Sequence, residues 1–99
     1  VQDTLIEMAR RIDVARTYTR AVAQRYLAGE DVVTEVSMAK NTAVYACDFV
    51  VDEAVQIFGG MGYMRESEVE RHYRDARILG IGGGANEIMN EVISKRMGL

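Results

Sequence analysis

The sequence contains no proline and no tryptophan, and it has one cysteine and one histidine among its 99 residues. A single thiol cannot form an intramolecular disulfide, which is typical of a reducing compartment, and one Cys with one His does not predict a zinc site. No apolar run approaches the roughly 20 residues that span a bilayer. Residues 1–11 also lack the basic segment and apolar core of a secretory signal. We expect a protein that is neither secreted nor inserted in a membrane.

Acidic and basic residues are interspersed, and the formal net charge is -3. Because no stripe or run of Lys and Arg appears, nucleic acid is not an expected partner. Hydrophobic residues make up 48% of the chain, which argues against intrinsic disorder. A chain of this length forms one domain. Its first residue, Val1, lies at the edge of an expected helix, so we expect residues 1–99 to be a domain cut from a larger protein.

Glycine clusters divide the chain into segments whose apolar residues recur at three- and four-residue steps, the spacing of helices. The first predicted helix covers residues 3–27 and ends at Gly29, because glycine readily adopts a left-handed conformation. The second begins near Thr34, whose hydroxyl is a candidate N-cap, and stops at Gly59. Two long helices are therefore expected before Gly59.

Two later segments, residues 66–79 and 85–97, predict shorter helices. The second long helix carries apolar residues on more than one side, as the central member of a bundle would. The segments together predict an all-α fold, an up-down four-helix bundle with two long and two shorter helices. The expected interior positions of the long helices are Leu5, Met8, Ile12, Ala15, Thr19, Val22 and Tyr26, then Ala39, Ala43, Ala46, Val50, Ala54 and Ile57.

Two glycine-rich stretches are the candidate sites. Residues 59–63, GGMGY, either end a helix in a tight turn or leave room for a ligand to approach the backbone. No strand precedes them, so they are not a strand-turn-helix dinucleotide fingerprint. Residues 80–88, GIGGGANEI, are either a hinge between helices or an anion site at a helix N-terminus. They lack the Lys and Ser/Thr of a P-loop, which argues against a nucleoside triphosphate.

Reactive side chains are few. His72 stands beside Arg74 and Asp75 without a candidate nucleophile, so we interpret it as a solvated histidine and the Arg and Asp as structural ion-pair partners. Cys47 is interpreted as a small core residue. Side-chain chemistry alone therefore predicts no catalytic centre.

Residues 54–89, AVQIFGGMGYMRESEVERHYRDARILGIGGGANEIM, strongly resemble the C-terminal signature of the acyl-CoA dehydrogenase family. That signature runs A-V-Q-I-x-G-G-x-G-Y, then V-E-R-x-x-R-D-A, then I-x-x-I-Y-E-G-T-x-E-I. Residues 1–16 and 37–44 look like earlier segments of the same domain, so the resemblance covers essentially the whole chain. The matching positions are Gln56, Gly59, Gly60, Gly62, Tyr63, Val69, Glu70, Arg71, Arg74, Asp75, Ala76, Ile78, Ile81, Gly84, Glu87 and Ile88.

The resemblance implies FAD-dependent α,β-dehydrogenation of an acyl-CoA thioester. In that reaction a glutamate removes the α-proton, the β-hydrogen leaves as hydride to the flavin, and the electrons pass to an electron-transferring flavoprotein. The resemblance also implies a homodimer or homotetramer, with two stretches of this chain at FAD and two glycines at the substrate. The implied FAD contacts are Gln56, Ile57, Phe58, Gly59 and Gly60, toward a neighbouring subunit's adenine nucleotide, and Ala85, Asn86 and Glu87, and the implied substrate contacts are Gly83 and Gly84.

The chain departs from the family signature at the catalytic position. Many members keep the glutamate base where this chain has Gly83, and their tyrosine and threonine are replaced by Gly82 and Ala85. Glycine has no proton-accepting side chain, so no catalytic residue is expected in this chain. The resemblance is closest to the long-chain and isovaleryl branch, which also lacks an acid here and takes its base from an upstream helix. Glu87 lies in the following helix and is not expected to replace it.

We therefore expect the C-terminal domain of an FAD-dependent acyl-CoA dehydrogenase, inactive as an isolated chain. Two alternatives remain: a non-enzymatic helical module that self-associates, and a domain of a related flavoenzyme such as an acyl-CoA oxidase. The expected location is the bacterial cytoplasm or the mitochondrial matrix. Segments outside this chain line the acyl pocket in the family, so the sequence does not indicate an acyl chain length.

Overall fold

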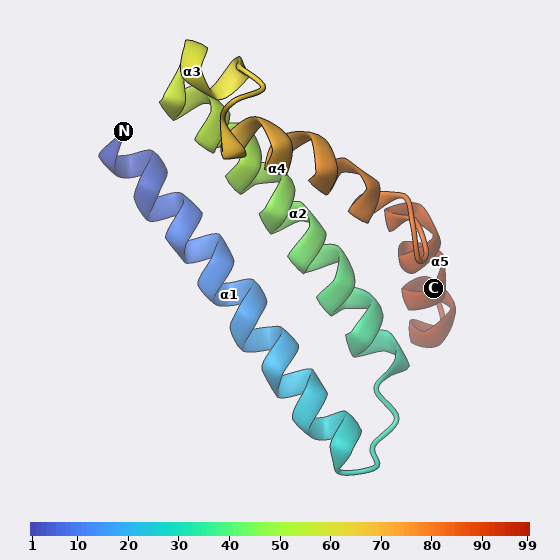
Figure 1. Ribbon diagram of the computed structural model, residues 1–99. Coiled ribbons are helices and arrows are strands. Elements are labelled where there is room, and N and C mark those ends of the chain that lie inside the picture. The colour runs from blue at the N-terminus through green and yellow to red at the C-terminus, as the bar shows by residue number, and fades with distance from the viewer.

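The computed structural model describes residues 1–99 and consists of helices joined by turns. Two long helices, α1 (Gln2–Leu27) and α2 (Val33–Phe58), run side by side in opposite directions (Figure 1). The all-α fold class expected from the sequence is confirmed. The remaining elements, in chain order, are helices α3 (Gly60–Tyr63) and α4 (Glu68–Ala76), the 3-10 turn η1 (Arg77–Gly80) and helix α5 (Asn86–Met97).

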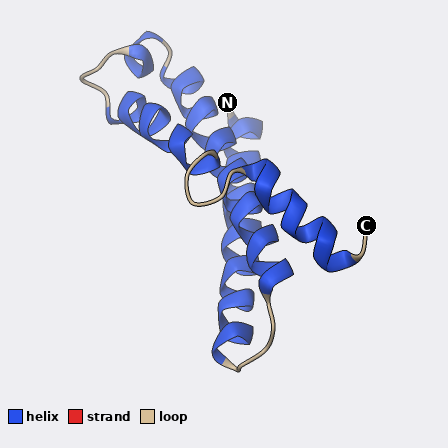
Figure 2. Ribbon diagram, turned by 90° about the vertical axis from the view of Figure 1, so that its right-hand side faces the viewer, coloured by secondary structure: helices blue, strands red, loops and turns tan.

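Helix α2 is the centre of the arrangement. It packs against every other element, whereas α1 packs extensively only against α2. Helices α4 and α5 lie on the side of α2 that faces away from α1, and α5 diverges from the long helices (Figures 1 and 2). Ala39 and Ala46 are buried on α2, where small side chains allow its neighbours to approach closely. The prediction that the second helix buries more than one side is therefore confirmed.

The ends of the long helices agree with the glycine pattern but not with the predicted cap. Gly29, with φ +87°, follows the last turn of α1, as expected. The prediction of Thr34 as N-cap is wrong, because α2 already begins at Val33. The Val33 N–H donates instead to Asp31 Oδ1 at 3.3 Å. Val32 is only 4% exposed, and its burial directs the chain into the helix before Thr34 is reached.

The segment after α2 contains more breaks than predicted. The short helix α3 was not expected, because four residues are too few to show a helical period. The predicted helix over 66–79 is shorter than expected: α4 starts at Glu68, after Ser67, whose Oγ accepts a hydrogen bond from the Val69 N–H at 3.2 Å. Its last part is the tighter turn η1, which brings the chain toward the glycines.

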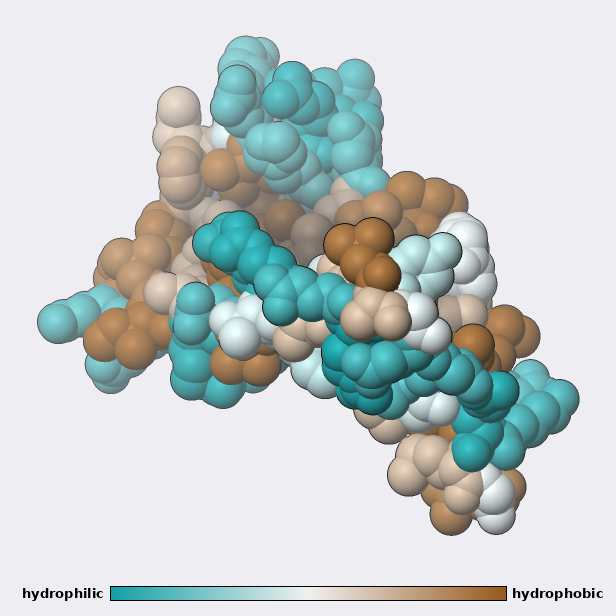
Figure 3. Space-filling view, turned by 90° about the horizontal axis from the view of Figure 1, so that it is seen from below, coloured by the Kyte–Doolittle hydropathy of each residue, from teal (hydrophilic) through white to brown (hydrophobic).

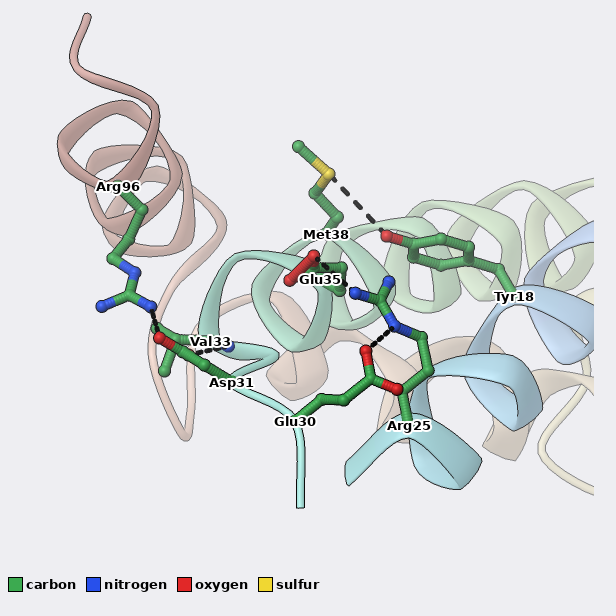
Figure 4. A network of polar contacts seen from close by, with 8 residues as sticks. All are labelled: Tyr18, Arg25, Glu30, Asp31, Val33, Glu35, Met38 and Arg96. Carbon is green, nitrogen blue, oxygen red and sulfur yellow. Dashed lines mark hydrogen bonds and ion pairs between the residues drawn. The ribbon is translucent and has the colours of Figure 1, made fainter. Parts of the chain in front are cut away.

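Charged residues connect the α1–α2 turn to both long helices and to α5 (Figure 4). Arg25 Nε donates to Glu30 at 3.0 Å, and its Nη2 lies 3.6 Å from a Glu35 oxygen. Arg96, near the end of α5, pairs with Asp31, and this hydrogen bond holds the pKa of the Asp31 carboxyl below its ordinary value. These side chains are 42–65% exposed except that of Glu35, at 25%, so the pairs contribute orientation more than stability.

Much apolar surface remains uncovered. The chain measures 46 × 24 × 24 Å with a radius of gyration of 15.7 Å, against roughly 13 Å for a compact chain of this length. Only 10 of 99 residues are buried. The expected interior residues Ala15 and Val22 are buried, but Leu5 is 50% and Tyr26 67% exposed. Apolar side chains lie at the surface among polar ones when the molecule is seen from below (Figure 3), so these faces are available for contact with further protein.

Helix α3 packs closely against the end of α2 at Gly62, where there is no room for a side chain. A Cβ at this buried position would lie 2.7 Å from the Val55 carbonyl oxygen and 2.9 Å from Phe58 Cβ. We expect Gly62→Ala to destabilise the chain by about 1–3 kcal/mol, because the backbone must move to relieve the overlap. Denaturant unfolding monitored by circular dichroism measures this. Gly60→Ala is the matched control, since a Cβ there meets nothing within 4 Å; equal losses in both variants would contradict the explanation.

Candidate functional site

The glycine turn, residues 80–85, joins η1 to α5. Gly83 has φ +68° and Gly84 has φ +101°, a region that side-chain-bearing residues rarely adopt. A Cβ on Gly84 would lie 2.5 Å from Met89 Cε, whereas a Cβ on Gly83 would meet nothing within 4 Å. Gly83 is therefore required by its backbone conformation alone, and the space beside it is open to a ligand.

The glycine turn presents a run of unpaired donors. The N–H groups of Gly83, Gly84 and Ala85 donate to no acceptor in the chain. Helix α5 follows directly, no side chain caps its N-terminus, and the N–H groups of a first helical turn have no partners within the helix. Such consecutive donors at the positive end of a helix dipole fit an anionic group such as a pyrophosphate. The anion-site interpretation of this stretch therefore has physical support.

Two adjacent residues of α2, which the sequence analysis did not select, hold the glycine turn and the start of α5. Lys40 Nζ donates to the Leu79 carbonyl oxygen at 3.2 Å and to the Gly84 carbonyl oxygen at 2.6 Å. Asn41 is buried, and its Nδ2 donates to the Asn86 carbonyl oxygen at 3.2 Å and to Asn90 Oδ1 at 2.9 Å. The sequence feature that could have identified these two residues is a Lys-Asn pair among the small and apolar residues of this helix.

Two amide oxygens beside the start of α5 have no hydrogen-bond donor. The amide oxygens Asn41 Oδ1 and Asn86 Oδ1 are buried and accept no hydrogen bond from the chain. Leaving a buried polar atom unpaired costs roughly 1–3 kcal/mol, so such atoms usually meet a partner. Because these two oxygens are buried, the groups open to a ligand are the N–H groups of the glycine turn, which fit the pyrophosphate of a cofactor such as FAD.

The second glycine-rich stretch, residues 59–63, ends helix α2 and leaves part of its backbone accessible. Gly59, with φ +61°, terminates α2, so the helix-terminator interpretation is confirmed. A Cβ at Gly59 or Gly60 would meet nothing within 4 Å, which leaves their backbone accessible. Gln56 and Phe58 are exposed, and Ile57 is half-buried. This stretch therefore also fits a ligand that approaches the main chain.

The two predicted FAD-binding stretches lie at separate places along α2. Asn86 is bonded to Asn41, which precedes Gln56 by 15 residues, or roughly 22 Å along a helix axis. Gln56 and Asn86 nevertheless line one groove of about 1100 Å³ between α2, α4 and the start of α5. The structure therefore places one residue of each stretch on a shared groove but keeps the stretches apart along α2, which is compatible with contacts to different parts of FAD or to different FAD molecules.

The remaining candidates are unsuited to chemistry. His72 is exposed, and Arg74 bonds Glu70 at 3.0 Å, which lowers the pKa of that carboxyl. Arg74 also lies 3.7 Å from Asp75, so the structural ion-pair interpretation is confirmed. Cys47 is half-buried, and burial raises the pKa of its thiol. No group of three His, Cys, Asp or Glu side chains is placed to bind a metal, and none of the helices is long and apolar enough to cross a bilayer.

Comparison with known proteins gives consistent matches. The family model described as acyl-CoA dehydrogenase, C-terminal domain, matches residues 1–98. The human mitochondrial short-chain specific acyl-CoA dehydrogenase is 40% identical over 94 residues, 95% of this chain and 23% of the relative. A probable acyl CoA dehydrogenase from Mycobacterium abscessus superposes with a TM-score of 0.97 at 82% identity, over 98% of this chain and 26% of that one. Butyryl-CoA dehydrogenase from Megasphaera elsdenii superposes with a TM-score of 0.95 at 35% identity, over 99% of this chain and 26% of that one. The chain spans about a quarter of these relatives.

Alanine substitutions at two adjacent positions of the glycine turn should have different effects on stability. Gly83→Ala places a side chain at positive φ, and we expect a loss of about 1–2 kcal/mol in the free energy of unfolding. Gly82 does not have a positive φ, and its Cβ would meet only Ile78 atoms at 3.5 Å or more. Gly82→Ala should therefore change stability by less than about 1 kcal/mol. Denaturant unfolding of both variants decides; a Gly82→Ala loss as large as that of Gly83→Ala would contradict the backbone argument.

Proposed function

Because the chain belongs to the acyl-CoA dehydrogenase family, as its C-terminal domain, we propose that it contributes FAD contacts and subunit packing to the α,β-dehydrogenation of an acyl-CoA thioester by a longer protein. The observation that carries the proposal is the run of unpaired N–H groups from Gly83 to Ala85, continued into α5. The family match and this donor set point to the same ligand. The electrons are proposed to pass to an electron-transferring flavoprotein.

Bound FAD would supply the acceptor for the β-hydrogen of the thioester, which leaves as hydride while a base takes the α-proton. The residues of this chain bind and orient in that reaction. The N–H groups of the glycine turn and of Asn86 and Glu87 donate to cofactor or substrate oxygens, and the helix dipole of α5 favours negative charge there. Gly83 leaves room for the thioester, since nothing lies within 4 Å of a Gly83 Cβ, and Gly84, whose Cβ position is occupied by Met89, would contact it through its backbone N–H.

The base is proposed to be a glutamate in a part of the protein outside residues 1–99. Gly83 has no side chain to accept a proton, and the open space beside it is available to a carboxylate from elsewhere. Glu87 lies in the first turn of α5, is exposed, and is assigned no part in proton transfer. This arrangement is the one implied by the resemblance to the long-chain and isovaleryl branch.

The second contact stretch, Gln56 to Gly60, is proposed to meet the adenine nucleotide of a neighbouring subunit's FAD. Its open glycine backbone and exposed Gln56 side chain support that role. The proposal requires a homodimer or homotetramer, in which this stretch lies at a subunit boundary. Because the human relative is mitochondrial by name and other relatives are bacterial, we propose a bacterial cytoplasmic or mitochondrial matrix location.

The alternatives from the sequence are less well supported. A non-enzymatic helical module does not explain a family match over residues 1–98. An oxidase is not favoured, because the relatives compared above are described as dehydrogenases.

The proposed division of labour predicts where activity is found. The longer protein, with FAD, an acyl-CoA and an artificial electron acceptor, should show turnover, and the isolated chain should show none above the no-protein rate. Glu87→Gln in the longer protein should retain kcat within about threefold, because loss of a true general base costs about 10²–10⁴. Acceptor reduction followed spectrophotometrically measures both. Turnover by the isolated chain, or a collapse of kcat in Glu87→Gln, would assign the base to this domain.

A groove between α1 and α2 is the surface best suited to subunit packing. It consists of two adjoining apolar hollows of about 630 and 440 Å³ that share Thr19 and Ala43. Ala43 is exposed although its neighbours Ala39 and Ala46 are buried, so another helix has access to it. Exposed apolar grooves of this kind commonly become covered in assemblies.

We expect this groove to drive self-association. Sedimentation velocity should show dimers or larger species for the wild-type chain, and Ala43→Glu should shift them to monomer by placing a charge in the apolar groove. Thr17→Glu is the control, because Thr17 is exposed and lies outside the groove. A wild-type chain that remains strictly monomeric at high concentration, or an equal effect of Thr17→Glu, would be evidence against the assignment.

A further inference from the structure

We propose that Lys40 is a positioning residue of the cofactor site: its ammonium group orients the peptide between Gly84 and Ala85 so that the Ala85 N–H is directed at FAD. The inference rests on the proposed function and extends it to a residue of α2 that has no direct contact with the ligand. Lys40 lies 44 residues before Gly84 in the sequence, so the tertiary fold alone brings the two together.

The side-chain hydrogen bonds of Lys40 go to residues at the two ends of the glycine turn. Its Nζ donates to the carbonyl oxygens of Leu79, at 3.2 Å, and Gly84, at 2.6 Å, which lie on the two sides of the turn. A lysine ammonium has three donors, so these bonds use two of them. One side chain thus joins the entry and the exit of the turn, and the glycines between them are held at a fixed span.

The geometry of the peptide bond converts this contact into an orientation. All peptide bonds of the chain are trans, and in a trans peptide the C=O and N–H groups point in opposite directions. Because the Gly84 carbonyl oxygen faces Lys40, the N–H of Ala85 points away from Lys40. That N–H has no acceptor in the chain, and it stands directly before the free N–H groups of α5. Lys40 therefore aligns the last donor of the turn, the Ala85 N–H, with those of the helix.

The charge of Lys40 is not neutralised by a carboxylate. None of the ion pairs of the chain involves Lys40, whereas the other lysine, Lys95, lies 3.7 Å from Glu91. Lys40 is half-buried, so water screens its charge less than it screens an exposed one. A positive charge balanced only by carbonyl dipoles, next to a helix N-terminus, adds to the attraction for an anionic pyrophosphate.

Asn41 supplies an independent attachment one residue further along α2. Its amide holds the Asn86 carbonyl and Asn90 from the buried side. Loss of Lys40 should therefore release the glycine turn without detaching α5. This separation makes a local effect of Lys40 distinguishable from general unfolding.

The experiment compares Lys40→Met, which keeps the apolar stem and removes the donors, with Lys95→Met, which removes an equal charge at an exposed site. Both are made in the longer protein. Hydrogen exchange of the amides of residues 80–88 is measured without FAD, and the FAD dissociation constant by quenching of flavin fluorescence. We expect Lys40→Met to raise both the exchange rate and the dissociation constant about tenfold or more, as loss of hydrogen bonds to a charged group does. Exchange within α1 should not change, and Lys95→Met should resemble the wild type.

Lys40→Arg keeps the charge and the donors, and should restore FAD affinity to a value between those of the wild type and Lys40→Met, even if the methionine variant folds poorly. The inference is overturned if wild type binds FAD and Lys40→Met matches Lys95→Met in both measurements. It is also overturned if Lys40→Arg binds FAD no better than a folded Lys40→Met. A wild-type protein that binds no FAD would overturn the proposed function and this inference together.

Discussion

The structure depends on α2 being covered on two sides at once. Helix α1 packs on one side of it, and α3, α4, η1 and α5 pack elsewhere along it, while α1 has no other extensive partner. Residues 39–44 of α2 show how this is achieved: Ala39 is buried, Lys40 bonds the glycine turn, and Val44 Cγ1 comes within 3.4 Å of where a Gly80 Cβ would lie. Residues three and four apart share a helix face, so adjacent positions must serve different neighbours. The location of the candidate site follows from this one helix.

The candidate site is built mainly from backbone groups. The donors are the N–H groups of Gly83, Gly84 and Ala85 and those of the first turn of α5. Side chains act indirectly: Lys40 and Asn41 hold carbonyl groups, which sets the direction of the N–H groups that follow. The proposed ligand site therefore needs no catalytic constellation of side chains in this chain. In the proposed function such a backbone site binds and orients, and a carboxylate from another part of the protein takes the proton.

The helices pack into a defined all-α fold, but much of their apolar surface is exposed. With 10 of 99 residues buried and a radius of gyration of 15.7 Å, most apolar side chains stand at faces that this chain does not cover. The relatives are about four times as long, since the chain spans 23% of the human protein and 26% of the structure from Mycobacterium abscessus. The apolar groove along Thr19 and Ala43 and the open glycines of residues 59–60 are the places where neighbouring protein or cofactor would add most.

The sequence by itself determined the helices, their approximate limits, the family and the absence of a base at Gly83, because helical periodicity and glycine conformations are local properties. It predicted the wrong cap at Thr34, because burial of Val32 decided where α2 begins. It also could not select Lys40 or Asn41, whose partners lie 39 to 49 residues later in the chain. Only the packing of η1 and α5 on α2 gives these polar side chains their acceptors. The tertiary structure therefore decided how the donors of the site are aimed, since hydrogen bonds between distant segments exist only after the helices have packed.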